Sequence, residues 1–169
     1  MIRIVMIRSA TIDDVNELLA IYAPYVEKTA ITFEYTVPSF ADFENRMKQT
    51  LLKFPYLVYQ EDGNILGYAY ASTYKDRAAY DWSCEVSIYV AEKARGKQIG
   101  TKLYDALEKE LTDMGMKNFL ACITYPNDAS IAFHQKRGYE KVAHFTKIGY
   151  KFDKWHDMIW MQKRVEDKS

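Results

Sequence analysis

Hydrophobic residues recur at spacings of three and four in two long stretches of the chain, and this pattern predicts two amphipathic helices. The first helix follows Thr11, a residue type that caps helix N-termini. Its predicted apolar positions are Val15, Leu18, Leu19 and Tyr22. The second helix starts near Ile99, and its predicted apolar stripe consists of Leu103, Leu107, Leu111 and Met114.

Two further helices are predicted from their terminal residues. Ser39, with Asp42 three positions later, resembles a capping box and predicts a helix that runs to about Lys53. Residues 128–137 form another candidate helix. Gly138 is expected to end it, because glycine readily adopts the left-handed conformation that stops a helix.

Strands are predicted where short apolar or alternating runs lie between turn residues. They cover residues 2–8, 56–60, 65–74, 81–90, 118–123, 139–147 and 155–164. Residues 61–64, Glu-Asp-Gly-Asn, are expected to join the second and third strands as a hairpin. Without internal repeats or linkers, the chain is expected to be one mixed α/β domain over residues 1–169, with a partly antiparallel central sheet.

The strand at 81–90 has two chemically different faces, because side chains alternate along a strand. The face expected in the core carries Cys84, Val86, Ile88 and Val90. The opposite face carries Ser83, Glu85, Ser87 and Tyr89. A core strand has no need of a carboxylate between two hydroxyls, so Glu85 is a candidate general base, with an ordinary ion pair as the alternative.

Composition narrows the possible partners. Lys and Arg number 23, as do Asp and Glu, so no net field favours nucleic acid or an anionic membrane. The first eight residues include two arginines, which fits neither a signal peptide nor a membrane span. Cys84 and Cys122 are expected to be free, buried thiols of a cytoplasmic protein. His134, His144 and His156 show no metal-ligand spacing, so no metal is expected.

The segment from Arg95 to Thr101 lies between the strand at 81–90 and the helix near Ile99. A helix N-terminus presents unpaired N–H groups and a partial positive charge, which suit a phosphate. Gly96 and Gly100 let a ligand approach the backbone, and Arg95 and Lys97 add charge. A solvated glycine turn is the alternative, and the spacing matches none of the common nucleotide loops.

Two segments resemble motifs of the GNAT acetyltransferases. Arg95-Gly96-Lys97-Gln98-Ile99-Gly100 resembles their pyrophosphate-binding turn, Arg/Gln-x-x-Gly-x-Gly/Ala, with Gln98 in place of the first glycine. Residues 86–90 are similar to the central strand whose backbone pairs with pantetheine in that superfamily. Residues 127–139 resemble its Asn-x-x-Ser/Ala-x-x-Phe-Tyr-x-x-x-Gly-Phe/Tyr element, with His134 at the position often held by tyrosine.

Nearly the whole chain resembles one family within this superfamily, the phosphinothricin and methionine sulfone (or sulfoximine) acetyltransferases. The matching segments are residues 32–38, 77–90 and 149–162. The resemblance implies a GNAT fold, with a mostly antiparallel twisted sheet of about seven strands flanked by about four helices. It also implies acetyl-CoA as co-substrate, a small amino-acid-like acceptor acetylated on its α-amino group, and a homodimer.

Candidate site residues follow from the motifs and the resemblance together. The predicted catalytic residues are Glu85 and His134, one of which is the base. The predicted cofactor-binding residues are Ile88, Tyr89, Val90, Arg95, Gly96, Lys97, Gln98, Ile99, Gly100, Thr101, Asn127 and Ser130. The predicted substrate-binding residues are Phe33, Arg77, Tyr80, Glu85, Ser87 and Lys151. Arg77 is included because a guanidinium binds a carboxylate through two hydrogen bonds, although it is also a candidate for a solvated turn residue.

Other functions stay open at this point. The acceptor is alternatively a polyamine, an aminoglycoside or a protein N-terminus. A different class of function is a CoA-binding regulatory module without catalysis, which Glu85 and His134 argue against and Gln98 mildly favours. No basic stripe interleaved with aromatic residues indicates a nucleic-acid partner.

Overall fold

Seven strands form one sheet in the computed structural model, which describes residues 2–166. They are β1 (Val5–Ser9), β2 (Tyr56–Glu61), β3 (Asn64–Thr73), β4 (Ser83–Val90), β5 (Asn118–Tyr125), β6 (Glu140–Lys151) and β7 (Lys154–Arg164). Their order is β1-β2-β3-β4-β5-β7-β6, and every neighbouring pair is antiparallel except β4 and β5. The predicted mixed, mostly antiparallel architecture is confirmed.

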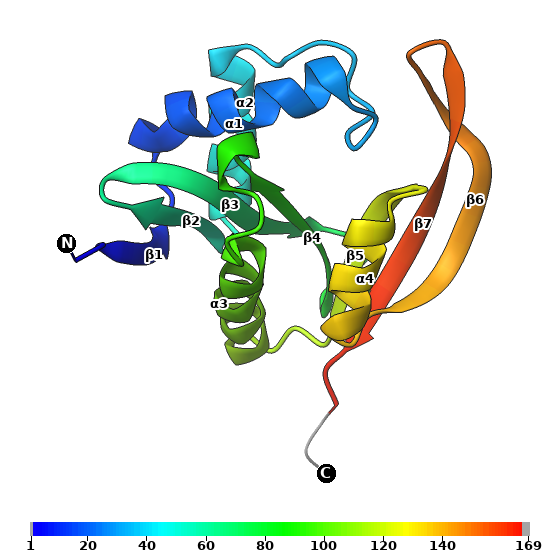
Figure 1. The fold of residues 1–169 in the computed structure, drawn as a ribbon. Coiled ribbons are helices and arrows are strands. Elements are labelled where there is room, and N and C mark those ends of the chain that lie inside the picture. The colour runs from blue at the N-terminus through cyan, green and yellow to red at the C-terminus, as the bar shows by residue number, and fades with distance from the viewer. Residues whose placement is uncertain (1, 167–169) are drawn as a thin grey trace.

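Four α-helices pack on the sheet in the described part of the chain (Figure 1). They are α1 (Val15–Lys28), α2 (Phe40–Leu51), α3 (Ile99–Asp113) and α4 (Asp128–Lys136). Helices α1 and α2 lie together and bury an apolar cluster that includes Leu18 and Met47. Helix α3 contributes its predicted stripe, Leu103, Leu107 and Leu111, to a second cluster on the opposite face of the sheet. The central strands β2 and β3 are therefore buried on both faces, which explains their nearly continuous apolar sequences, whereas β6 is mostly exposed.

The predicted helix ends are mostly confirmed. Ser39 caps α2, because its Oγ accepts a hydrogen bond from the N–H of Asp42 at 3.1 Å. Gly138 adopts the left-handed conformation just after α4, with φ of +93°. The prediction for Met114 is wrong, because α3 ends one residue earlier and Gly115 turns the chain away, which leaves Met114 52% exposed.

The two C-terminal strands are longer than predicted. They form a hairpin whose turn is Phe152-Asp153, and both turn residues have positive φ, +53° and +57°. Two-residue hairpin turns of this kind usually contain asparagine or glycine. The sequence lacks that signal here, so the strand predicted to end at 147 in fact continues to Lys151. Figure 1 shows this hairpin extending alongside the segment that follows α1.

The parallel strands β4 and β5 part in the middle of the sheet. They pair only from Ser83 to Glu85 on β4 and from Asn118 to Leu120 on β5. Beyond Glu85, β4 stays paired with β3 on its other edge. The edge of β4 that faces β5 is consequently unpaired with β5 from Val86 onward, which leaves its backbone groups available to a ligand, except the Val90 carbonyl, which accepts a hydrogen bond from Tyr25.

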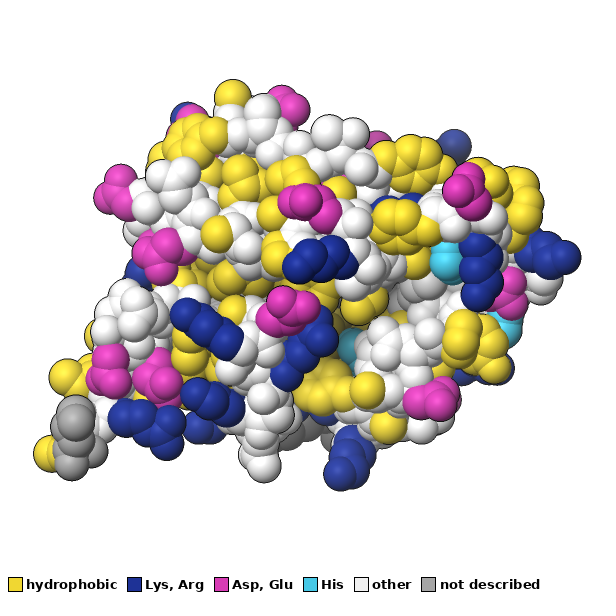
Figure 2. Space-filling model, turned by 45° about the horizontal axis from the view of Figure 1, so that its top comes forward, with side chains coloured by type: hydrophobic (Ala, Val, Ile, Leu, Met, Phe, Trp, Pro, Cys, Tyr) yellow, Lys and Arg dark blue, Asp and Glu magenta, His cyan; other side chains and the backbone are white. Residues whose placement is uncertain are grey.

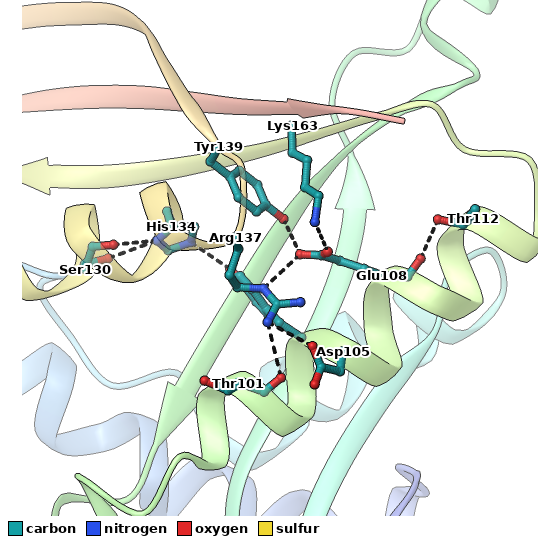
Figure 3. Close-up of polar contacts among 10 residues, drawn as sticks. Thr101, Asp105, Glu108, Thr112, Ser130, His134, Arg137, Tyr139 and Lys163 are labelled. Carbon is teal, nitrogen blue, oxygen red and sulfur yellow. Dashed lines mark hydrogen bonds and ion pairs between the residues drawn. The ribbon is translucent and has the colours of Figure 1, made fainter. Parts of the chain in front are cut away.

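A buried carboxylate fixes α3, α4 and the last strand relative to one another (Figure 3). Glu108 on α3 accepts hydrogen bonds from Arg137 Nε at 3.2 Å, Tyr139 Oη at 3.0 Å and Lys163 Nζ at 2.6 Å. Arg137 also pairs with Asp105 at 3.0 Å. One acidic side chain thus holds two cations and a phenol that come from two later segments of the chain, the connection after α4 and strand β7.

Replacing Glu108 with Ala is expected to destabilise the fold by about 3–5 kcal/mol, because two partly buried cations lose their carboxylate. Urea unfolding would measure the loss. The control is Asp113→Ala on the same helix, which removes an exposed pair with Lys109 and should leave the unfolding midpoint essentially unchanged. Equal effects of the two variants would contradict the structural role of Glu108.

Candidate active site

An inner cavity of about 300 Å³ lies where β4 and β5 part. Phe33 from the segment after α1, Glu85 and Ser87 from β4, Thr124 from β5 and His134 from α4 are among the residues that line it. The predicted alternation on β4 explains why Glu85 and Ser87 reach the cavity, since they lie on the face opposite the buried Cys84; Val86 and Ile88 also contribute to the lining. The cavity is therefore walled by segments from most of the chain length.

Glu85 is the carboxylate in this cavity. Burial raises the pKa of its side chain above the usual range for a glutamate. Within residues 2–166 no hydrogen bond or ion pair engages the carboxylate, in contrast to Glu108, which is fully engaged. A partly desolvated and unengaged carboxylate is the group expected of a general base.

His134 is held in one tautomer. Its Nδ1 lies 2.7 Å from the carbonyl oxygen of Ser130, and its Nε2 lies 3.0 Å from the hydroxyl of Tyr104. Because a carbonyl oxygen only accepts, Nδ1 carries the proton and Nε2 accepts from Tyr104. The ring is 3% exposed, and burial lowers the pKa of His134. The imidazole is consequently neutral near pH 7, with both nitrogens hydrogen-bonded.

An outer groove of about 560 Å³ adjoins the inner cavity and shares Ile88, Asn127 and His134 with it. The groove runs past the start of α3, where Gly96 adopts φ of +84°. No side chain of the described residues caps this helix start, so its first N–H groups are available to an anion. Figure 2 shows Lys and Arg side chains near the middle of the molecule, among scattered acidic ones.

Gln98 explains how the turn forms without its expected glycine. It is the N-cap residue of α3 and adopts the left-handed conformation, with φ of +60°. Glycine adopts this conformation without steric cost, and other residues pay about 1–2 kcal/mol for it. The turn therefore keeps the shape that the motif requires, at some cost in stability.

The sequence model of the "Acetyltransferase (GNAT) domain" family matches residues 7–160. The chain belongs to the GNAT acetyltransferases. The predicted superfamily and the predicted class of enzyme, an acyltransferase, are thereby confirmed.

Several characterised GNAT proteins are similar over nearly the full chain. A phosphinothricin N-acetyltransferase of Streptomyces viridochromogenes is 32% identical over 97% of this chain and 90% of its own. An L-methionine sulfoximine/L-methionine sulfone acetyltransferase of Pseudomonas aeruginosa is 31% identical over 95% of this chain and 94% of its own. The crystal structure of a phosphinothricin acetyltransferase from Sinorhizobium meliloti in complex with AcCoA matches with a TM-score of 0.92, at 33% identity, over 95% of this chain and 88% of that one.

Most residues predicted to bind the cofactor line the outer groove of this GNAT domain. They are Ile88, Val90, Arg95, Gly96, Gln98, Ile99, Gly100, Thr101, Asn127 and Ser130. Tyr89 lines the inner cavity instead, and Lys97 lines neither space. Arg95 lies over the ring of Tyr25, at 5.6 Å, and the Tyr25 hydroxyl donates to the carbonyl of Val90 at 2.5 Å.

The residues predicted to bind the substrate divide into two groups. Phe33, Glu85 and Ser87 line the inner cavity. Arg77 and Tyr80 lie outside it on the exposed connection between β3 and β4, where Arg77 is the N-cap of the short helical turn Ala78–Tyr80. Lys151 is buried apart from the cavity, with its ammonium on two carbonyl oxygens. Their roles at the substrate stay predictions.

Several lining residues were missed by the sequence analysis, among them Tyr104, Phe133 and Tyr25. Tyr104 lies one position after Leu103 on the apolar face of α3, so its pattern looked like packing. Phe133 lies in the motif of residues 127–139, and the aromatic position of that motif could have identified it as a lining residue. Tyr25 is one more apolar residue of α1, and no local pattern distinguishes it.

Residues 2–166 contain no helix that is long and apolar enough to cross a membrane. In the same range, no three His, Cys, Asp or Glu side chains gather closely enough to hold a metal ion.

Replacing Gln98 with Gly is expected to raise the free energy of unfolding by up to about 1 kcal/mol, because glycine adopts the left-handed conformation freely. Thermal or urea unfolding would measure the change. The neighbouring Lys97→Gly is the control, because Lys97 has no positive φ and should lose stability through backbone entropy alone. Equal losses in both variants would show that the left-handed conformation of Gln98 is not strained.

Proposed function

We propose that this GNAT protein transfers the acetyl group of acetyl-CoA to the α-amino group of a small amino-acid-like acceptor, of the phosphinothricin, methionine sulfone or methionine sulfoximine type. The observation that carries the proposal is the junction of two spaces, an outer groove at a helix N-terminus and an inner cavity with an unengaged carboxylate. Relatives that act on these amino acids cover nearly the whole chain.

The residues of the outer groove fit a pantetheine pyrophosphate. The uncapped start of α3 provides N–H groups to the phosphates, Gly96 leaves room beside the backbone, and Arg95 provides charge. When bound there, acetyl-CoA supplies an acetyl thioester. The open edge of β4 is available to hydrogen-bond the pantetheine arm.

The N–H groups along β4 point alternately toward β3 and toward the gap, and this alternation supports an assignment of the donors for the developing oxyanion. The N–H of Ala91 donates to Leu66 on β3, so the N–H groups of Glu85, Ser87 and Tyr89 also point toward β3. The N–H groups of Val86, Ile88 and Val90 then point toward the gap between β4 and β5. We assign the oxyanion donor to the N–H of Ile88 or of Val90.

We assign the base to Glu85. An α-amino group has a pKa of about 7.7–8.0 and must lose its proton before it attacks the thioester. Glu85 reaches the inner cavity with no competing partner among residues 2–166, whereas the Nε2 lone pair of His134 is taken by Tyr104. Tyr104 also lines the cavity, and its hydroxyl is our candidate to give a proton to the leaving thiolate, because neutral His134 holds its proton on Nδ1 against the Ser130 carbonyl.

Purified protein would be tested for CoA release with methionine sulfone, methionine sulfoximine, phosphinothricin, spermidine, an aminoglycoside and a peptide. Turnover is expected on the first three acceptors. Turnover only on spermidine, the aminoglycoside or the peptide would overturn the acceptor class. Binding of acetyl-CoA without any turnover would indicate a regulatory module.

The pH dependence of kcat/KM tests the base. Only ionised Glu85 accepts a proton, so activity falls as the pH drops through its raised pKa, above the ordinary value of about 4.3. Glu85→Gln should remove this acidic limb and lower kcat about 10²–10⁴-fold. His134→Ala is the comparison variant. If it removes the acidic limb while Glu85→Gln keeps it, His134 is the base.

We also propose that the enzyme is a cytoplasmic homodimer. Both cysteines are free thiols, which suits a reducing compartment, although Cys122 is only partly buried. Strand β6 is an edge strand with exposed apolar side chains, including Val142, Phe145 and Ile148. Exposed apolar edges of this kind are normally covered.

Sedimentation velocity would test the dimer. Ile148→Glu, which places a charge on the apolar edge, should weaken association at least about tenfold. The control is Leu52→Glu, at an exposed position beyond α2. Dimers of unchanged stability in Ile148→Glu would exclude β6 as the interface.

A further inference from the structure

One wall of the inner cavity is formed by the segment between α1 and α2. Ile31, Thr32 and Phe33 line the cavity, and they lie between α1 and α2 with no helix or strand of their own. A segment without regular hydrogen bonds needs side chains from elsewhere to hold it in place. The shape of the cavity therefore depends on what fixes residues 29–35.

Lys151, at the end of β6, provides one such anchor. Its side chain is buried, with the residue 3% exposed, and its ammonium donates to the carbonyl of Val26 at 2.7 Å and to that of Thr32 at 2.9 Å. Val26 lies in the last turns of α1, where carbonyl groups carry partial negative charge. Both hydrogen bonds of Lys151 thus go to backbone, and one holds the cavity wall itself.

Its neighbours on the hairpin hold the same segment. Gly149 lies against the ring of Phe33 so closely that a Cβ on it would come within 2.3 Å of a ring atom. The Tyr35 hydroxyl donates to the carbonyl of Tyr150. Consecutive residues of β6 therefore contact the segment through a glycine surface, a carbonyl and an ammonium.

Other parts of the chain hold the remaining residues of the segment. Thr124 on β5 donates to the carbonyl of Ala30 at 2.7 Å. Arg46 on α2 binds both carboxylate oxygens of Glu34, at 2.6 and 3.0 Å. Lys151 differs from these anchors because it joins the cavity wall to the C-terminal hairpin, which lies at the opposite end of the sequence.

We propose that Lys151 is a positioning residue for the acceptor, which acts by fixing the Thr32–Phe33 wall and does not touch the acceptor. This inference rests on the proposed function. It gives Lys151 a different role from the direct substrate contact that the resemblance implies. The geometry favours it because the ammonium is already engaged by two carbonyls and lies outside the lining of the inner cavity.

The test compares two acceptors in the variant Lys151→Met, which has a side chain of similar length without the charge. The acceptors are methionine sulfone and the amine that remains when its carboxylate is removed. A positioning role predicts that KM rises for both acceptors by the same factor, about tenfold, with KM for acetyl-CoA within about twofold of wild type. Loss confined to the carboxylated acceptor would show direct contact and overturn the proposal.

The control is Lys154→Met, at an exposed position in the same hairpin, which should leave both KM values unchanged. If Lys151→Met does not fold, Gly149→Ala tests the wall by a second route, because the added methyl meets Phe33. Its acceptor KM should rise, and Phe33→Leu combined with it should recover part of the loss. Unchanged kinetics in Gly149→Ala would count against the proposal.

Hydrogen exchange separates this inference from the proposed function. Amides of residues 29–35 should exchange at least about tenfold faster in Lys151→Met than in wild type, while those of α3 keep their rates. If wild-type protein acetylates none of the acceptors, the proposed function fails, and the exchange comparison still decides whether Lys151 holds the wall. Equal exchange in both proteins would overturn the inference.

Discussion

The parting of β4 and β5 is the constraint on which the site depends. Two parallel strands that stayed paired would satisfy each other's backbone and leave no room between them. Here pairing stops at Glu85 and Leu120, and both strands continue. The gap presents N–H groups of β4 on one side and cavity-lining side chains of β5 on the other, so the unpaired backbone and the cavity that Glu85 lines meet at the same point of the sheet.

Keeping that gap open requires the flanking helices to be held from outside it. Helix α4 carries His134 into the cavity wall and has only nine residues. Glu108 fixes its end through Arg137 and fixes the following strands through Tyr139 and Lys163 (Figure 3). Glu108 is buried and fully engaged, and it stabilises the packing. Glu85 is only half-buried and makes no such contacts within the described part of the chain, and our proposal assigns it the proton of the acceptor amine.

A feature could be predicted from the sequence when the residues that form it lie close together in the chain. The outer groove is built mainly from residues 94–101 and 127–134 and from β4, three short segments that each carry a recognisable local pattern; Tyr25 and Ile31 complete it. Ten of the twelve predicted cofactor residues line it. Met114 and the Phe152-Asp153 turn were misread because a helix end and a glycine-free hairpin turn leave weak local signals. Tyr104 was missed because a lining residue and a packing residue share one helical stripe.

The acceptor side of the site was harder to predict for a related reason. Its wall is made by residues 31–33 and is held by β5, α2 and the C-terminal hairpin, up to 119 residues away in the sequence. A lysine that binds carbonyls and a lysine that binds substrate look alike in a motif, and only the fold separates them. Residues near the cofactor can thus stay constant while the hairpin and its anchors change the cavity wall. This division offers a physical route by which one acetyl-transfer scaffold accepts different amines, without any change to the groove or to Glu85.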